Sequence, residues 1–274
     1  MEQLHFPANL PTQGFTEILS PANSPLTYLG MGIVRLLGHE TYQTNLNENE
    51  GCLNILGGSC TVSIRSKSGD ATYVEIGQRA NVFAGKPFMV YLPLGSAIKI
   101  TAHSDTVEAA LITCKAEIGF EPRLIYPDET ESKVVGKDNW QRNVLTSVGE
   151  NVHAQRLLVG ETINPPGNWS SSPPHKHDVD APPEAKMEEI YHYRTNPIQG
   201  YGIQRIYTPT TDQYPFDSTY VVKNGDSVVI PRGYHPVVAA PGYQLYYLWA
   251  LAGAKREYGA WTDDSDHAWI KGIN

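Results

Sequence analysis

The segment NGDSVVIPRGYHPVVAAPGYQLYYLWALAG, residues 224–253, has a weaker counterpart in AGKPFMVYLPLGSAIKITAHSDTVEAALITC, residues 84–114. Both segments read as a strand, a Pro-x-Gly turn, a second strand, a further turn and a third strand. Pro93 and Gly95 precede Pro231 and Gly233 by the same number of positions (231 − 93 = 138 and 233 − 95 = 138). Such self-similarity indicates two copies of one β unit, each about half of the chain.

Short strand patterns recur along the rest of the chain. They are rich in β-branched or aromatic residues and are bounded by Gly, Pro, Asn or Asp. Many short strands at close spacing favour a sandwich or a barrel over alternating βαβ units. We therefore expect an all-β protein with one or two short helices. The predicted strand segments are 61–65, 71–76, 89–92, 97–101, 189–193, 204–207, 227–230 and 244–249.

Composition and charge exclude several classes of protein. The chain has 274 residues and a formal net charge of −8, with no Lys/Arg-rich run, so we expect no nucleic-acid partner. Its N-terminus lacks the pattern of a secretory signal, and its most apolar late segment is broken by Pro, Gly and Gln residues, so we expect no membrane partner. Cys52, Cys60 and Cys114 match neither a disulfide framework nor a zinc ribbon. We expect reduced thiols and a cytoplasmic location.

Two histidines follow a pair of prolines in the stretch SSSPPHKHDVD, residues 170–180. In an extended strand His175 and His177 point to the same side and Lys176 points to the other. Two imidazoles about 7 Å apart on one face can converge on one metal ion. Pro173 and Pro174 restrict the backbone directly before His175, which would hold this pair of histidines in place.

Further candidate ligands follow in the second half of the chain. Glu188 and Glu189 begin the next predicted strand, and the pattern Gly-x5-Pro-x-Gly-x-His places His235 after a tight turn. Two histidines, a glutamate and a late histidine form a set that could close around a divalent cation. The first half has no His-x-His sequence, and Ala97 stands where the second copy has His235. Any metal site is therefore expected in the second half alone.

These motifs resemble those of the cupin superfamily and, more specifically, of the 5-deoxy-glucuronate isomerase family of myo-inositol catabolism. The resemblance is carried by NWSSSPPHKHD, EEIYHYR, GYGIQRIYT, GDSVVIPRGYHPVVAAPGYQLYYLWALAG and the late DHAWI. It implies a bicupin, with two jelly-roll β-barrel domains: a degenerate domain at residues 1–140 without metal, and a metal-binding domain at residues 141–274. It also implies isomerisation of 5-deoxy-glucuronate to 5-dehydro-2-deoxy-gluconate.

Carried over by position, the metal ligands of this family fall on His175, His177, Glu189 and His235. The family pattern prefers Glu189 over Glu188 because Glu189 directly precedes the Ile-Tyr step. His192 is a departure, since the family usually has Tyr there. Zinc, manganese and iron(II) all suit this ligand set, so the sequence does not choose among these divalent metals.

The implied chemistry moves a proton between two carbons and needs a general base. Candidate catalytic residues are Glu188, Tyr191, Tyr207 and Tyr247. A small-molecule sugar acid also needs a cationic partner for its carboxylate, for which Arg suits best. Arg205 is the first candidate, followed by Lys176 and Arg194.

Other functions remain open at this point. A related uronate isomerase of pectin breakdown and an iron-dependent cupin dioxygenase are enzymatic alternatives. A non-catalytic sugar-binding bicupin is an alternative from another class, although such a protein does not need a complete metal site. Because symmetric oligomers are common, we also expect a homo-oligomer.

Overall fold

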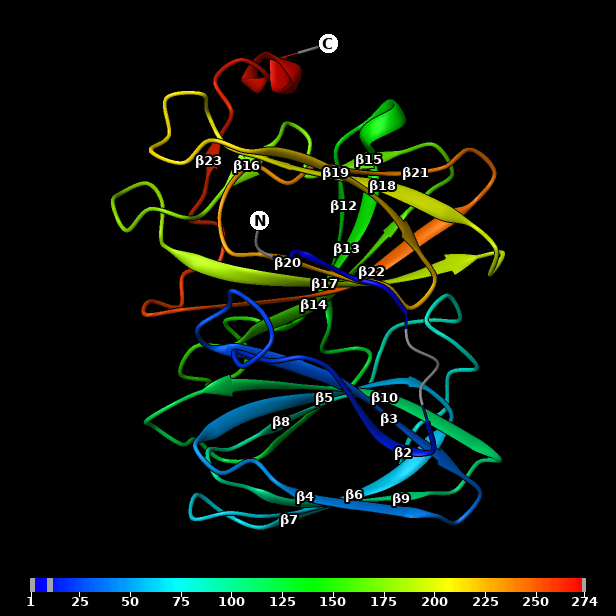
Figure 1. Ribbon diagram of the computed structural model, residues 1–274. Coiled ribbons are helices and arrows are strands. Elements are labelled where there is room, and N and C mark those ends of the chain that lie inside the picture. Colours follow the sequence, from blue (N-terminus) through cyan, green and yellow to red (C-terminus); the bar gives the residue numbers. More distant parts are fainter. Residues whose placement is uncertain (1–2, 9–11, 273–274) are drawn as a thin grey trace.

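Four β-sheet layers are stacked in the computed structural model, which describes residues 3–8 and 12–272 (Figure 1). The lower two layers in Figure 1 are built from the first half of the chain. The six-stranded layer has the order β11 (Arg123–Ile125), β8 (Met89–Leu92), β5 (Asn49–Gly57), β10 (Thr106–Lys115), β3 (Leu29–Leu37) and β2 (Gly14–Leu19). The outer layer has the order β4 (Thr41–Asn45), β9 (Ala97–Ala102), β6 (Ser59–Arg65) and β7 (Ala71–Gly77).

The second half of the chain forms the upper two layers in the same way. Its seven-stranded layer has the order β1 (His5–Phe6), β20 (Ser227–Ile230), β17 (Met187–Asn196), β22 (Gln244–Gly253), β14 (Leu158–Asn164), β13 (Arg142–Val148) and β12 (Glu131–Val135). Its outer layer has the order β15 (Trp169–Ser170), β21 (Val237–Ala239), β18 (Tyr201–Tyr207) and β19 (Asp217–Lys223). A further pair joins β16 (His175–Lys176) to β23 (Thr262–Asp263).

The prediction of an all-β protein is confirmed. Every predicted strand segment lies within an observed strand, and the two helices of the described residues are short 3-10 helices, η1 (Asp138–Trp140) and η2 (Ala268–Gly272). Neither of these described helices has the length and apolar character needed to cross a membrane. The three cysteines are buried and unpaired, as expected for reduced thiols.

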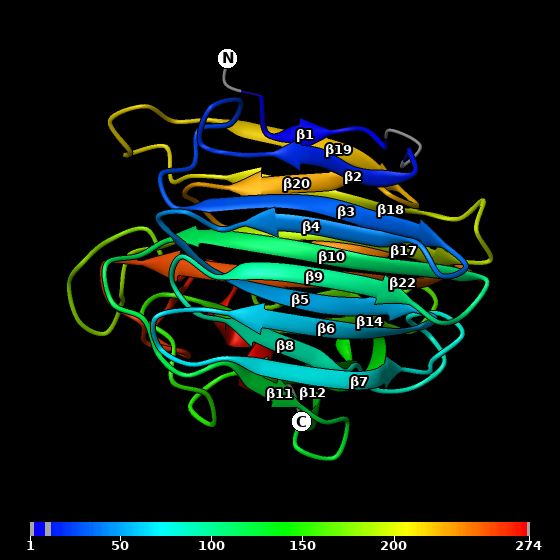
Figure 2. The same cartoon turned by 90° about the horizontal axis from the view of Figure 1, so that it is seen from below.

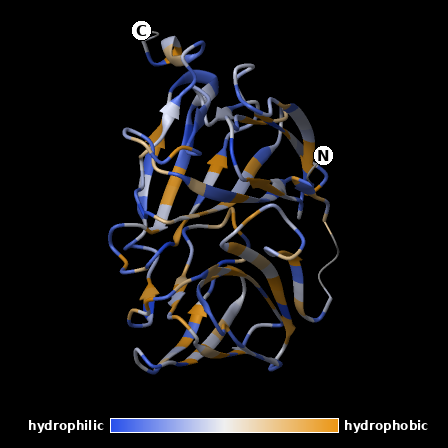
Figure 3. Ribbon diagram, turned by 60° about the vertical axis from the view of Figure 1, so that its left-hand side comes forward, coloured by the Kyte–Doolittle hydropathy of each residue, from blue (hydrophilic) through white to orange (hydrophobic). Residues whose placement is uncertain are grey.

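Burial explains why some strands alternate in polarity and others do not. In the outer strand β6, Cys60, Val62 and Ile64 are buried, whereas the residues between them are partly exposed. The central strand β22 is buried from Leu245 to Gly253, because a sheet covered on both faces has no solvent side. The strand axes of the stacked layers are nearly aligned, with paired neighbours antiparallel (Figure 2). Figure 3 shows the apolar segments on these strands and largely hydrophilic residues in the loops.

The repeat seen in the sequence has a structural counterpart. β20 and β22 lie 138 positions after β8 and β10 (227 − 89 = 138 and 244 − 106 = 138), and each pair occupies the same place in its sheet. Gly95 and Gly233 turn the chain in both copies with positive φ, +69° and +92°, which glycine adopts without strain. The outer layers also match strand for strand in their spatial order.

Two short strands join the sheet of the opposite half. β1 lies near the N-terminus but pairs with β20, with His5 opposite Val228. β12 precedes residue 140 but pairs with β13, with Val135 opposite Arg142. The large sheet of the second half is therefore completed by residues from the first part of the chain.

The two central layers pack face to face around a buried polar network. Glu161 on β14 accepts hydrogen bonds from Arg79 at 2.6 and 3.0 Å, from Asn54 at 2.7 Å and from Tyr246 at 2.7 Å. Both Glu161 and Asn54 are fully buried, and Arg79 is 6% exposed. Breaking such a buried pair leaves an uncompensated charge, so this network ties the two halves together.

A reciprocal pair of glutamates forms a second link between the halves. Glu50 on β5 accepts backbone N–H bonds from residues 155–157 at 2.7–3.1 Å, just before β14 begins. Glu188 on β17 accepts backbone N–H bonds from residues 27–29 at 2.7–2.8 Å, where β3 begins. The two glutamates are equivalent in the repeat (188 − 50 = 138). Each carboxylate therefore holds the start of a central strand in the other half.

This anchor generates a prediction about stability. Replacing Glu188 by Gln removes the negative charge that three backbone N–H groups share, and should lower the free energy of unfolding by about 1–3 kcal/mol. Glu50→Gln should have a similar effect because its contacts are equivalent. Urea denaturation measures both effects, with Glu121→Gln on an exposed loop as the control. Unchanged stability in both variants would rule out the proposed anchoring.

Candidate metal centre

Three histidines from two segments of the chain converge inside the second half. His175 lies on β16, His177 follows it in the loop, and His235 lies between β20 and β21. One ring nitrogen of each lies within 4.8 Å of the others. The ring centroids of His175 and His177 are 4.7 and 5.1 Å from that of His235. All three imidazoles can therefore donate to one ion.

Glu189 on β17 completes this group. Its Oε2 lies 3.2 Å from Nε2 of His177 and 3.4 Å from Nε2 of His235. Glu189 is 4% exposed, so its carboxylate is shielded from water by the surrounding sheets. Because side chains alternate along a strand, Glu189 points to the cavity side of β17 while Glu188 points to the first half of the chain.

The histidine tautomers suit metal binding. Nδ1 of His177 lies 2.8 Å from the Met187 carbonyl, and Nδ1 of His235 lies 3.0 Å from the Gly233 carbonyl. A carbonyl only accepts hydrogen bonds, so Nδ1 of both His177 and His235 carries a proton. Nε2 of each ring then faces Glu189. Nε2 of His235 is buried without a hydrogen-bond partner. An orphaned nitrogen beside a buried carboxylate is the donor arrangement that a divalent cation satisfies.

Burial also sets the protonation of these ligands. It lowers the pKa of His235 to about 4 and, together with the neighbouring His235 and His177, holds the pKa of His175 well below its usual value. Burial acts in the same direction on His177, but the hydrogen bond and charge of Glu189 outweigh it and raise the pKa of His177. His175 and His235 are therefore neutral at pH 7, and a cation would compete with a proton for Nε2 of His177.

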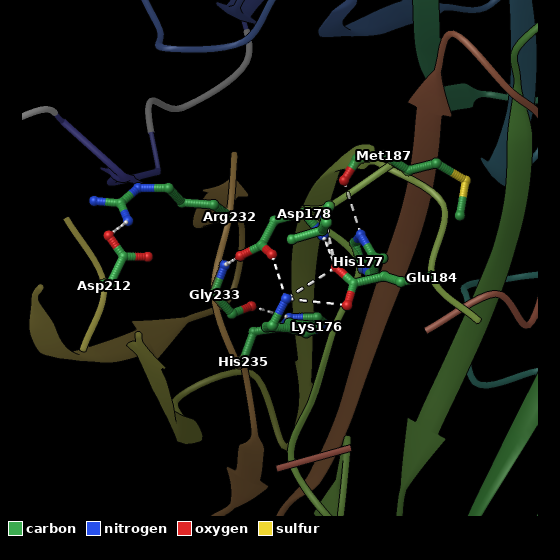
Figure 4. Close-up of polar contacts among 10 residues, drawn as sticks. Lys176, His177, Asp178, Glu184, Met187, Asp212, Arg232, Gly233 and His235 are labelled. Carbon is green, nitrogen blue, oxygen red and sulfur yellow. Dashed lines mark hydrogen bonds and ion pairs between the residues drawn. The ribbon is translucent and has the colours of Figure 1, made fainter. Parts of the chain in front are cut away.

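A network of charged residues holds the loop that carries His177 (Figure 4). Lys176 donates to Asp178 at 2.6 Å and to both oxygens of Glu184 at 3.0 Å. Asp178 accepts the backbone N–H of Gly233 at 2.7 Å. This bond links the loop of His177 directly to the turn that precedes His235. The sequence analysis missed Asp178, although it directly follows the His-x-His motif.

His175, His177 and Glu189 line a cavity of about 340 Å³ over the large sheet of the second half, and the His235 ring lies beside the two other imidazoles. The tyrosine hydroxyl of Tyr247 is bonded to Ser170 at 2.7 Å, and that of Tyr191 is bonded to Ser171 at 3.3 Å. Burial raises the pKa of both tyrosines, so they are neutral hydrogen-bond donors at pH 7. Other lining residues include Trp140, Arg142, Val144, Thr146, Thr162, Trp249, Tyr258 and Trp261.

The segment before the C-terminus closes one side of this cavity. β23 pairs with β16, and the Trp261 ring stacks on His175 with centroids 5.0 Å apart. Asp264 donates its backbone N–H to the Pro174 carbonyl at 2.8 Å, which fixes the chain just before His175. No periodic pattern in the sequence marks Trp261, because its role depends on a pairing between distant segments.

The structure brings together only part of the predicted catalytic set. Tyr191 and Tyr247 line the cavity together with three of the candidate ligands, His175, His177 and Glu189. Glu188 does not, because it is held by backbone amides at the interface of the two halves. Tyr207 is also directed elsewhere, since its hydroxyl donates to Asp264 at 2.5 Å outside the residues that line the cavity. The geometry therefore does not support Glu188 or Tyr207 as the general base.

None of the predicted carboxylate-binding residues lines the cavity. Arg205 forms a two-point ion pair with Asp217 at 2.7 and 2.9 Å on the outer layer and is partly exposed. Arg194 pairs with Glu108 of the first half, and Lys176 is held in the loop network. The geometry therefore does not support these three residues as binding partners of the substrate carboxylate. The sequence shows that they are cationic but not which acid each one meets.

Comparison with known proteins supports the sequence interpretation. A model of the KduI/IolB family matches residues 8–270. A 5-deoxy-glucuronate isomerase from Geobacillus kaustophilus is 37% identical over 273 residues, which cover 98% of this chain and 96% of the relative. A 5-deoxy-glucuronate isomerase from Listeria monocytogenes serotype 4b is 38% identical over 261 residues, which cover 93% and 92%.

Solved structures agree with this assignment. An IolB-like protein from Salmonella typhimurium LT2 has a TM-score of 0.90 at 33% identity, covering 98% of this chain and 99% of that one. Lactobacillus farciminis oxalate decarboxylase has a TM-score of 0.71 at 12% identity, covering 100% and 91%, which shows likeness of fold alone. The resemblance inferred from the sequence motifs is thereby confirmed at the level of the family. With a family match over nearly its whole length and relatives above 30% identity, the chain belongs to the KduI/IolB family.

Proposed function

We propose that this protein is a metal-dependent aldose–ketose isomerase that converts 5-deoxy-glucuronate to 5-dehydro-2-deoxy-gluconate in myo-inositol catabolism. The activity follows from the family and from the names of its relatives. The observation that carries the metal dependence is the convergence of His175, His177, His235 and Glu189 beside a cavity, with Nε2 of His235 left without a partner. A sugar-binding protein without catalysis would not need this arrangement.

The four candidate ligands would hold a divalent metal, which we propose to be zinc, manganese or iron(II). When bound, such an ion supplies a Lewis acid that stabilises negative charge on the sugar oxygens. The rings of His177 and His235 are held in place before binding, because the Met187 and Gly233 carbonyls orient them. This preorganisation lowers the cost of assembling the site.

Tyr191 and Tyr247 are proposed to act on the substrate. Both hydroxyls line the cavity and are oriented by serine partners. Because their raised pKa keeps them protonated, each can donate a hydrogen bond to an oxygen where negative charge develops during proton transfer. Both tyrosine side chains are buried, which strengthens these contacts.

Several broader expectations are retained as proposals. The repeated strand order supports a bicupin with domains at residues 1–140 and 141–274. Strands β1 and β12 lie in the first of these ranges but pair with strands of the second large sheet. The family and the absence of a membrane-spanning helix among the described residues are compatible with a cytoplasmic enzyme. We also propose a homo-oligomer, on the general frequency of symmetric assemblies alone.

The activity can be tested directly. The purified protein should convert 5-deoxy-glucuronate into a ketone product that appears in the NMR spectrum. Treatment with a chelator should abolish turnover, and addition of zinc, manganese or iron(II) should restore it. The hexulosuronate formed in pectin breakdown serves as the competing substrate in the same assay. Faster turnover of that competing uronate would favour the related isomerase instead.

Removal of a candidate ligand should remove both metal and turnover. His175→Ala and His235→Ala each take one of four donors away, so the bound metal should fall well below one ion per chain and turnover should fall to background. His103→Ala, an exposed histidine outside the cavity, is the matched control. Elemental analysis measures the metal in each variant. A full metal complement with normal turnover in either ligand variant would contradict the assignment.

Asp178 should act by positioning the ligands. Asp178→Asn weakens the bond to the Gly233 N–H and the pair with Lys176, and should reduce metal affinity about 10–100-fold. Asp180→Asn changes an exposed residue of the same loop that pairs with Lys255, and should have little effect. Competition with a chelator of known affinity measures the difference. Equal metal affinity in the two variants would show that the Asp178 bonds do not support the site.

A further inference from the structure

Three cationic side chains other than histidine line the cavity, and they differ in their partners. Lys133 pairs with Glu131 at 2.7 Å, and Lys271 pairs with Asp263. Arg142 has no carboxylate within ion-pair distance among residues 3–8 and 12–272. Its Nη1 donates to the Trp140 carbonyl at 3.2 Å. Arg142 is thus a cation of the cavity whose remaining N–H groups are available to a ligand.

The surroundings of Arg142 increase the cost of leaving its charge without a carboxylate partner. The side chain is partly buried, and this burial lowers its pKa, although nearby Tyr247, Tyr191 and Tyr258 act in the opposite direction. A guanidinium nevertheless remains charged in proteins. A buried charge without a counter-ion is costly and is normally paired. An anion that enters the cavity would meet this requirement.

Arg142 also lies at a distance from the candidate ligands that suits a small sugar acid. Arg142, Val144 and Thr146 alternate along β13 and all line the cavity. β13 is separated from β17, which carries Glu189, by β22 and β14. At roughly 4.8 Å per strand the two backbones are about 14 Å apart, and side chains from both strands reach into this space. The cavity therefore has a cation at one side and a metal-ligand group at the other.

We propose that Arg142 binds the carboxylate of the substrate and so makes the enzyme selective for sugar acids. The planar guanidinium matches a carboxylate with two parallel N–H···O bonds, and it holds the acid end of the molecule away from His175, His177 and His235. The aldehyde end of the same molecule then faces the histidines. This proposal rests on the proposed isomerase function, because the ligand it names is the substrate of that reaction.

Kinetics with an acidic and a neutral substrate test this role. Arg142→Gln should raise KM for 5-deoxy-glucuronate about 10–100-fold, since a charge-assisted two-point contact is lost. KM for 5-deoxy-glucose, which lacks the carboxylate, should be unchanged, and Arg142→Lys should recover part of the acid preference. Metal content and thermal unfolding establish that each variant is folded and loaded. Parallel changes in KM for both sugars would overturn the proposal.

Two controls locate the effect at Arg142. Arg123→Gln removes an exposed arginine paired with Glu129 on the first half and should leave both KM values unchanged. Arg205→Gln removes the arginine that the sequence favoured, whose guanidinium is already paired with Asp217. A larger loss of acid preference in Arg205→Gln than in Arg142→Gln would also overturn the proposal.

A binding measurement separates this proposal from the proposed function. Calorimetric titration of D-glucuronate into the metal-loaded protein needs no turnover. Wild type should bind at least 10-fold more tightly than Arg142→Gln, whereas equal affinity, or no binding to wild type, would contradict the carboxylate subsite. If wild type binds the acid with this dependence on Arg142 but does not isomerise 5-deoxy-glucuronate, the isomerase function fails and the carboxylate subsite stands.

Discussion

The site depends on how strand β17 is anchored between the two halves of the molecule. Glu188 is bound by three backbone N–H groups at the start of β3, which fixes the register and the face of β17 against the first half. Because side chains alternate along a strand, Glu189 must then point into the second half toward the histidines. Two adjacent glutamates thus have different surroundings, one at the interface of the two halves and one beside the histidines of the candidate metal centre.

The repeat explains why one half has this group and the other does not. Gly51 and Ala97 occupy the positions that correspond to Glu189 and His235 (189 − 51 = 138 and 235 − 97 = 138). A side chain at Gly51 would meet the Ile112 carbonyl at 2.9 Å and Leu46 at 3.1 Å, so that space is already filled by apolar packing. The first half keeps the anchoring glutamate, Glu50, and its cavity over the corresponding strands is smaller, about 150 Å³ against about 340 Å³ in the second half.

Preorganisation is the common physical theme of the cavity. Backbone carbonyls orient His177 and His235, and Asp178 ties their two segments together. Burial keeps two of the imidazoles neutral and the tyrosines protonated, so the donors have the charge states that metal binding and oxyanion stabilisation need. The same low-dielectric surroundings make Arg142, which has no acid partner in the described residues, a strong receptor for an anion.

The sequence by itself determined the β class, the repeat and the positions of His175, His177, Glu189 and His235, because alternation and turn residues are local signals and the motif order is visible without a fold. It could not separate Arg142 from Arg205, or Tyr247 from Tyr207, since each pair differs only in its tertiary neighbours. Asp217 neutralises Arg205 across a hairpin, and Asp264 engages Tyr207 from the end of the chain. Pairing between distant segments decides which polar groups are satisfied elsewhere and which remain available in the cavity, and only the tertiary structure contains that information.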